Sequence, residues 1–292
     1  MPFQPAKPTF TSLNTFCLGK TGEGFGDDRV LSLPGRFDAI FDGVTGPNGS
    51  ASADLNVHVL RHFPADGTHR QLADAFAEAH RARFGSHTPG QRMAASTGAV
   101  LSHHHSQVFL WGDAIAVLVY RDHHVVHVDE ASFRWSEPLH FIRALYNRLY
   151  LKEHNLSEEV LLTQDFGREM LAPFGNVQHQ LANIEGGYSV ICAKPVPDSL
   201  LKSVEVTPDV EKVFLLSDGY PAKNFGFDDF RSIGTLNEAL EQQIMLDPYC
   251  LGPDYLEPES FPGNPGPKGL RKTGDRLNFS YDDCAINEIL VL

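Results

Sequence analysis

Five aspartates in this sequence stand where a predicted strand begins or ends, or in a tight turn between strands. Asp42 and Asp218 each follow an apolar run and precede a glycine; the others are Asp28, Asp113 and Asp282. One Asp-Gly pair after a strand is usually only a turn, so the signal is the recurrence of aspartates at distant strand ends. Carboxylates that converged would repel one another and raise their own pKa values. If these side chains meet, the sequence therefore predicts a cation among them.

The residue types select the cation and its chemistry. Ligation by oxygen alone favours Mg²⁺ or Mn²⁺, and Gly43 leaves the carbonyl after Asp42 unshielded, as a further oxygen ligand. Two such ions about 3.5 to 4 Å apart can share a carboxylate, acidify a bridging water and hold the oxygens of a phosphoryl group during in-line displacement. The pattern predicts hydrolysis of a phosphomonoester at a binuclear Mg²⁺ or Mn²⁺ centre.

Short strands and amphipathic helices must position these carboxylates. Composition and alternation predict strands at 12–18, 30–42, 99–102, 108–111, 114–120, 125–129, 188–193, 212–216 and 286–292. Helical spacing predicts helices at 50–63, 69–84, 136–152 and 235–246, two of them opened by the capping boxes Thr68-x-x-Gln71 and Thr235-x-x-Glu238. Consecutive short strands favour antiparallel pairing. The expected fold class is α+β, as one domain over 1–292 with a flap or insertion at about 130–185 and a Pro/Gly-rich loop at 247–269.

Composition excludes several classes of function. The chain of 292 residues has a formal net charge of -13 and no basic run, which argues against binding to nucleic acid. It has no secretory signal and no apolar run near the roughly 18 residues of a membrane span, so a cytoplasmic protein without membrane partners is expected. Its four cysteines lie far apart, which favours reduced thiols over a zinc site or a disulfide framework: Cys17, Cys192, Cys250 and Cys284.

Three other motifs have simple interpretations. The glycines of residues 19–28 lead into a strand rather than a helix, which disfavours a nucleotide-binding loop. His103-His104-His105 stands between two predicted strands, where adjacent side chains point in different directions, and is interpreted as a solvated hairpin loop rather than a metal cluster. Ser96-Thr97-Gly98 lacks the Gly-x-Ser-x-Gly elbow of a nucleophile and is interpreted as a strand start.

Six motifs follow one another along nearly the whole chain. They are Asp27-Asp28-Arg29-Val30, Phe41-Asp42-Gly43-Val44-Thr45-Gly46, Ala95-Ser96-Thr97-Gly98-Ala99-Val100, Gly112-Asp113-Ala114, Leu216-Ser217-Asp218-Gly219 and Asp282-Asp283-Cys284-Ala285. In order and rough spacing the set resembles the protein phosphatase 2C, or metal-dependent protein phosphatase, family. This resemblance implies two stacked antiparallel β-sheets flanked by α-helices, a four-layer αββα sandwich, with the metals in a cleft at one edge.

The resemblance also assigns roles to residues. It implies that Asp42 bridges two metal ions, that the carbonyl of Gly43 completes one metal site, and that Asp218 and Asp282 hold the other ion. Asp28 would act largely through water. Asp42, Asp218 and Asp282 would form the catalytic set, since the loss of any one of these carboxylates should nearly abolish turnover.

Other positions extend or depart from the family pattern. The resemblance links Asp113 to a third, more weakly held ion. Asp283 stands where the family often has asparagine, which makes it the poorer candidate for a ligand. Members commonly carry an arginine before the Asp-Asp motif to hold the substrate phosphate, whereas this chain offers Glu23 and Lys20. Val44 replaces a histidine that can protonate the leaving group, so another acid, metal-bound water or a low-pKa leaving group would have to serve.

The expected function is a Mg²⁺- or Mn²⁺-dependent phosphatase that acts on phosphoserine or phosphothreonine in proteins. One alternative is a catalytically impaired, phosphatase-like regulatory module that binds phosphopeptides, because the phosphate-holding arginine is missing. Retention of four residues argues against that alternative, since a fold without turnover has no chemical need for them: Asp42, Gly43, Asp218 and Asp282. Another alternative is a phosphatase for small phosphomonoesters.

Overall fold

Two antiparallel β-sheets stack face to face in the computed structural model, which describes residues 7–19, 26–44, 48–86, 93–129, 133–162, 164–220, 225–247, 251 and 283–292. The first sheet has the order β1 (Phe10–Leu18), β11 (Cys284–Val291), β10 (Val210–Leu216), β6 (Ile115–Tyr120) and β7 (Val125–Asp129). The second has the order β2 (Arg29–Leu33), β3 (Phe37–Gly43), β4 (Ala95–Ser102), β5 (Gln107–Trp111) and β9 (Lys202–Glu205), with β8 (Ile191–Cys192) paired to the start of β4. The antiparallel pairing expected from short consecutive strands is confirmed.

The single strand predicted over residues 30–42 is wrong, because a tight turn divides it into β2 and β3. Gly35 has a φ of 73°, which glycine adopts without strain, and the amide of Arg36 donates to the carbonyl of Leu33 at 2.9 Å. The two strands then pair in register, with Arg29 opposite Phe41. Asp42 consequently leaves the sheet at the same end at which Asp28 enters it.

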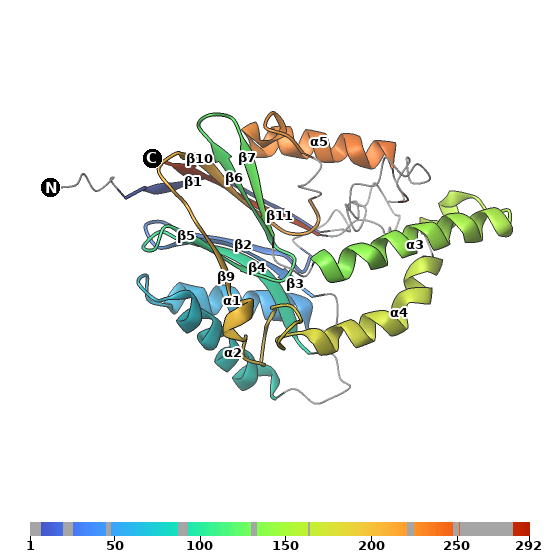
Figure 1. Ribbon diagram of the computed structural model, residues 1–292, viewed down its shortest axis with the longest axis horizontal. Coiled ribbons are helices and arrows are strands. Elements are labelled where there is room, and N and C mark those ends of the chain that lie inside the picture. The colour runs from blue at the N-terminus through green and yellow to red at the C-terminus, as the bar shows by residue number, and fades with distance from the viewer. Residues whose placement is uncertain are drawn as a thin grey trace.

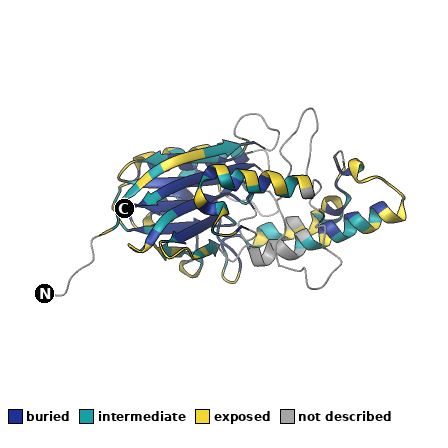
Figure 2. Cartoon of the chain, turned by 90° about the horizontal axis from the view of Figure 1, so that it is seen from above, coloured by how far each residue is buried: buried dark blue, intermediate teal, exposed yellow. Residues whose placement is uncertain are grey.

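The main core fills the space between the two sheets (Figure 2). Ile40 and Leu101 of the second sheet lie in one cluster with Leu118, Val213 and Ile289 of the first sheet, and all five are fully buried. Burial of side chains of this size stabilises the folded state by about 1.5–3 kcal/mol each. This apolar layer holds the sheets together.

Helices α1 (Gly49–His62) and α2 (His69–Phe84) cover the outer face of the second sheet (Figure 1). Phe76 of α2 makes edge contacts with Phe41 and Trp111 of the sheet, at centroid distances of 5.7 and 5.6 Å. The predicted capping box is confirmed, because Thr68 accepts from the amide of Gln71 while the Gln71 side chain accepts from the amide of Thr68.

Helix α5 (Ile233–Leu246) covers the outer face of the first sheet, where Leu236 and Leu240 pack against Phe214 and Ile286. The helix begins earlier than predicted. Ser232 caps it in a reciprocal pair with Thr235, so the box predicted from Thr235 to Glu238 is wrong. With helices on both outer faces and two sheets between them, the predicted αββα sandwich is confirmed (Figure 1).

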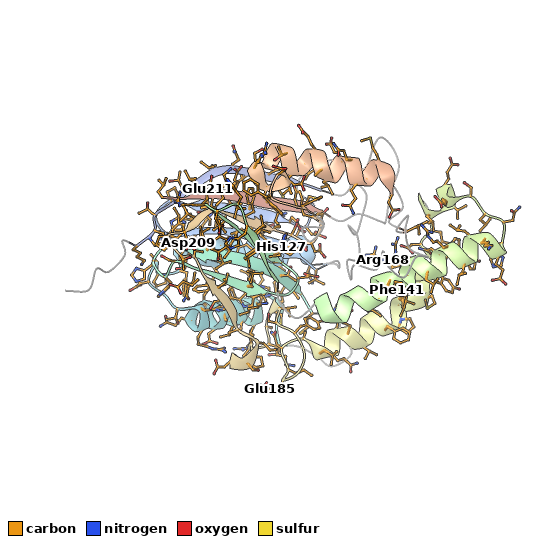
Figure 3. All side chains as sticks on the ribbon, turned by 45° about the horizontal axis from the view of Figure 1, so that its top comes forward. His127, Phe141, Arg168, Glu185, Asp209 and Glu211 are labelled. Atoms are coloured by element: carbon orange, nitrogen blue, oxygen red, sulfur yellow. The ribbon has the colours of Figure 1, made fainter. Side chains whose placement is uncertain are left out.

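Helices α3 (Phe133–Glu153) and α4 (Phe166–Gln178) pack on each other and extend away from the sandwich (Figures 1 and 3). Figure 3 labels Phe141 on α3 and Arg168 on α4, apart from His127 on β7. Short 3₁₀ turns lie at Glu158–Leu162, His179–Leu181, Asp198–Leu200 and Asp229–Arg231. Among the described helices, none combines the length and apolar character that crossing a membrane requires. Most of the Pro/Gly-rich loop predicted at 247–269 lies outside the described residues.

Candidate metal centre

Three of the predicted carboxylates meet at one edge of the sandwich. Asp42, Asp113 and Asp218 each offer an oxygen, the three oxygens lie within 4.8 Å of one another, and the three residues are half-buried. Asp42 ends β3 in the second sheet and Asp218 follows β10 in the first. Asp113 lies in the turn that carries the chain from β5 in one sheet to β6 in the other. The group therefore draws on strand ends from both sheets.

Backbone contacts hold the Asp42 turn closely. The amide of Gly43 donates to the carbonyl of Asp27 at 3.2 Å, and the amide of Val44 donates to the carbonyl of Ala95 at 3.0 Å. A Cβ at position 43 would overlap the backbone of Gly49 at the start of α1. Only glycine therefore fits directly after Asp42.

Glycines beside the other two aspartates serve the same purpose. Gly112 has a φ of 70°, and a Cβ there would overlap the side chain of Thr97. A Cβ at Gly219 would overlap the carbonyl of Asp283. Each turn that carries a carboxylate is thus packed against a neighbouring strand end.

Asp28 stands apart from the group of three. It is fully buried at the entry to β2 and is not among the carboxylates that meet within 4.8 Å. Its carbonyl accepts from Arg29 at 2.7 Å, while the Arg29 guanidinium also pairs with Asp54 of α1 at 2.6 Å. The nearby Cys17 thiol has its pKa raised to about 12, first by burial and then by the charge of Asp28. That thiol is therefore inert at neutral pH.

Three predicted positions lie outside the described residues. Asp282 precedes the described start of the last segment, and Glu23 and Lys20 lie between residues 19 and 26.

The donor set fits a hard divalent cation. Three carboxylate oxygens this close repel one another unless positive charge lies among them. Thr97, which stands opposite Asp42 in the β3–β4 register, adds a second observation. Its hydroxyl is buried, with 5% of the residue exposed, and has no hydrogen-bond partner among the described residues. A buried hydroxyl in that state indicates a ligand or ordered water beside Asp42.

A buried polar network supports β4 beneath this edge. Ser96, opposite Gly43 in the register, accepts from Ser52 at 3.1 Å and from the Asn56 amide at 2.5 Å. Nε2 of His80 donates to the side-chain oxygen Oδ1 of Asn56 at 2.9 Å, and burial lowers the pKa of His80 to about 4. The network ties α1 and α2 to the strand beside Gly43. Sequence reasoning missed it because its members come from three elements and share no local motif.

The interpretation of His103-His104-His105 as a solvated loop is wrong in part. Residues 103–106 do form the turn between β4 and β5, and His104 is exposed. His103 is buried instead, with Nε2 at 2.8 Å from a carboxylate oxygen of the buried Asp38. The turn folds His103 inward because Asp38 needs a hydrogen-bond partner in the core.

A scan against protein-family models gave no match, and neither did a search of the curated proteins. This chain is similar in structure to the serine/threonine phosphatase Stp1 from Staphylococcus aureus. The match covers 98% of this chain and 95% of the Stp1 chain, with 11% sequence identity and a TM-score of 0.50. This chain has the fold of the protein phosphatase 2C type. The fold implied by the sequence motifs is thereby confirmed.

Two further structures are similar over almost their full length. One is the catalytic domain of the serine/threonine protein phosphatase PstP in complex with two manganese ions, with 13% identity, coverage of 98% and 99%, and a TM-score of 0.44. The other is PppA, a regulatory component of the type VI secretion system of Pseudomonas aeruginosa, with 15% identity, coverage of 97% and 98%, and a TM-score of 0.46.

Proposed function

We propose that this protein is a metal-dependent phosphomonoester hydrolase, and more narrowly a serine/threonine protein phosphatase that uses two Mg²⁺ or Mn²⁺ ions. The observation that supports the proposal is the meeting of Asp42, Asp113 and Asp218 at one edge of a phosphatase-type sandwich. The orphan hydroxyl of Thr97 beside Asp42 supports it independently.

In this proposal each carboxylate has a separate task. Asp42 would be shared between two ions and the Gly43 carbonyl would complete one site, while Asp218 and Asp282 would hold the second ion. Asp113 would serve a weaker third position. Asp28, which is fully buried at the entry to β2, would act through water. The aspartates thus fix the positions of the ions before substrate arrives.

The reaction transfers a phosphoryl group to water. Divalent ions, when bound, act as Lewis acids and lower the pKa of a coordinated water. A water oxygen attacks phosphorus while the bond from phosphorus to the seryl or threonyl oxygen breaks, which yields the alcohol and inorganic phosphate. Val44 cannot protonate the departing oxygen, so another acid would have to protonate it or the leaving group would need a low pKa. Rates should therefore rise as the pKa of the leaving group falls.

Hydrolysis of an aryl phosphate and of a phosphothreonine peptide, each with Mn²⁺, Mg²⁺ or a chelator, tests the proposal. Metal-dependent release of phosphate from both substrates is expected. Turnover of the aryl phosphate alone would select an enzyme for small phosphomonoesters. Binding of the peptide without release of phosphate would select a phosphopeptide-binding module and reject the proposed enzyme.

Asp42→Asn is the sharpest variant for the metal centre. It removes the shared charge at constant size, so both ions should lose affinity together and turnover should nearly vanish. Asp218→Asn should weaken one ion preferentially. With chelator, either variant should melt above wild type because one of the repelling charges is gone. Calorimetric titration of Mn²⁺ and melting curves with and without Mn²⁺ measure these effects.

The matched control is Asp66→Asn, which removes one charge from an exposed side chain elsewhere on the surface. It should retain the metal affinity and the metal-induced rise in melting temperature of wild type. An Asp42→Asn protein that behaved like Asp66→Asn would refute the binuclear centre.

A further inference from the structure

Asp283 is a buried carboxylate at the entry to β11, next to the site but outside the group of three aspartates. Only 2% of the residue is exposed. Its Oδ2 accepts a hydrogen bond from the backbone amide of Asp27 at 2.7 Å. This short hydrogen bond ties the turn before Asp28 to the entry of β11.

The hydrogen bond continues into the second sheet. The carbonyl of Asp27 accepts from the amide of Gly43 at 3.2 Å. Asp283, Asp27 and Gly43 therefore form a chain of hydrogen bonds from β11 of the first sheet, through the turn before β2, to the end of β3 in the second sheet. We call this chain the Asp283 clip.

Close packing on both sides holds Asp283 in the position that the clip requires. Gly26 has a φ of 61°, and a Cβ there would overlap both carboxylate oxygens of Asp283. On its other side, the carbonyl of Asp283 accepts from the Ser217 hydroxyl at 3.4 Å and lies where a Cβ of Gly219 would be. The Ser217 hydroxyl also accepts from the amide of Ala285 at 2.8 Å. One residue thus contacts the turns before Asp28 and around Asp218.

We propose that Asp283 is a positioning residue whose carboxylate acts as a hydrogen-bond acceptor, not as a metal ligand. Through the clip it sets the spacing between the sheet edges that carry Asp42 and Asp218, and so the geometry in which those carboxylates hold a divalent cation. This inference rests on the proposed metal centre. It adds a residue outside the predicted ligand set and says which property of its side chain matters.

Two substitutions separate acceptance of a hydrogen bond from negative charge. Asp283→Asn keeps an oxygen that can accept from Asp27, so Mn²⁺ affinity should stay within about threefold of wild type. Asp283→Ala removes the acceptor, and Mn²⁺ affinity should fall by about 10–100-fold, as is usual when a partner of a ligand-bearing segment is lost. Calorimetric titration with Mn²⁺ alone measures both. Hydrogen exchange of the Asp27 backbone amide, measured in the presence of chelator, should stay slow in Asp283→Asn and become fast in Asp283→Ala.

The matched control is Asp229→Ala. Asp229 also accepts a backbone amide, that of Gly226 at 2.8 Å, but on the surface before α5. This variant loses the same kind of bond and should keep wild-type Mn²⁺ affinity.

Loss of Mn²⁺ affinity in Asp283→Asn as large as in Asp218→Asn would make Asp283 a ligand and overturn the proposal. Wild-type affinity and slow Asp27 exchange in Asp283→Ala would also overturn it. If Asp283→Ala does not fold, Asp283→Asn alone decides between acceptor and ligand. None of these readouts needs turnover. A protein that hydrolyses no phosphate ester would refute the proposed enzyme and leave the clip to be judged by metal affinity and amide exchange.

Discussion

Gly43 shows how tightly single positions are specified around the candidate metal centre. A side chain there would overlap the backbone of Gly49, and backbone cannot move aside as a flexible side chain can. Gly43→Ala should therefore lower the free energy of unfolding by about 1–3 kcal/mol, as overpacking usually does. Mn²⁺ affinity should fall with it, because the shift displaces Asp42. Urea unfolding with chelator and calorimetry with Mn²⁺ measure the two effects.

Gly226→Ala is the control for this prediction. Nothing lies within 4 Å of a Cβ at Gly226, and the position is exposed. Its free energy of unfolding should stay within about 0.5 kcal/mol of wild type. Equal stability of the two alanine variants would mean that the turn after Asp42 adjusts freely.

Individual site residues were predictable where a local signature marks them. Asp42 and Asp218 precede glycines at strand ends, and Asp113 follows one, so the sequence predicts them and the structure brings them together. Thr97 and Asp283 lie within two of the family-like motifs, but no adjacent glycine at a strand end marks them as site residues. Their importance depends on which distant turn lies against them, Gly112 for one and Gly26 for the other, and sequence spacing carries no such information.

At the scale of elements, the α3–α4 pair is held by a buried polar network. Arg143 of α3 pairs with Asp165 at 2.6 Å, and both side chains are about nine-tenths buried. Asp165 also accepts from Asn147 and caps α4 by accepting from the amide of Arg168, both at 2.9 Å. Burial alone would raise the pKa of Asp165, but Arg143 and these donors together lower it. Asp165 therefore stays ionised at neutral pH.

The same network shows a limit of predicting the buried face of α3 from helical spacing. Sequence periodicity predicts a helix with Ile142 and Leu149 on one apolar face, and the helix is confirmed. Yet Ile142 and Leu149 are 41% and 55% exposed, while Arg143 and Asn147 are buried. Hydrophobic spacing locates a helix reliably but cannot anticipate a buried ion pair, because polarity normally indicates solvent.

Asp165→Ala should destabilise the α3–α4 pair by about 3–5 kcal/mol, because it leaves the Arg143 charge buried without its partner and removes the cap of α4. Amide exchange over residues 166–178 should accelerate, while strands of the sandwich should stay protected. The double variant Arg143→Met/Asp165→Leu should recover part of the loss, since it leaves no uncompensated charge.

An exposed ion pair provides the comparison. Asp74→Ala breaks the surface pair of Arg70 and Asp74 and should cost no more than about 0.5 kcal/mol. If Asp165→Ala changed exchange in α4 no more than Asp74→Ala does, the network would not hold the helices together.

At the scale of the whole molecule, the pairing of distant strands is the feature of the fold that local sequence cannot predict. β1 pairs with β11 from the opposite end of the chain, and β10 lies between β11 and β6. Alternation of apolar residues predicts where strands are, and short turns predict that β6 pairs with β7. Neither pattern says which strands that are distant in the sequence pair with each other. The order of the family-like motifs carried that information, which is why the stacked sheets were predictable and the divided strand at residues 30–42 was not.

One buried and one half-buried histidine, His80 and His69, should make the stability of the whole fold depend on pH. Burial lowers the pKa of His80 and of His69 to about 4, with the charge of Arg70 adding to the effect at His69. The unfolded chain, whose histidines titrate near 6.5, then binds protons that the folded chain does not. The stability that these two neutral histidines contribute should be fully present above pH 6.5 and fall as the pH drops towards 4. Below pH 4 their contribution should change little. For His80 the loss should reach about 2 kcal/mol by pH 5.

His80→Gln tests this contribution, because glutamine can still donate to Asn56 but does not titrate. Urea unfolding with chelator between pH 7 and 4.5 should show a shallower decline for His80→Gln than for wild type, whatever the difference between them at pH 7. The control is His104→Gln, at an exposed position of the β4–β5 turn, which should decline in parallel with wild type. The carboxylates are the same in all three proteins, so their titration cancels in the comparison. A decline in His80→Gln as steep as in wild type would show that His80 takes up its proton in the folded state as readily as in the unfolded chain.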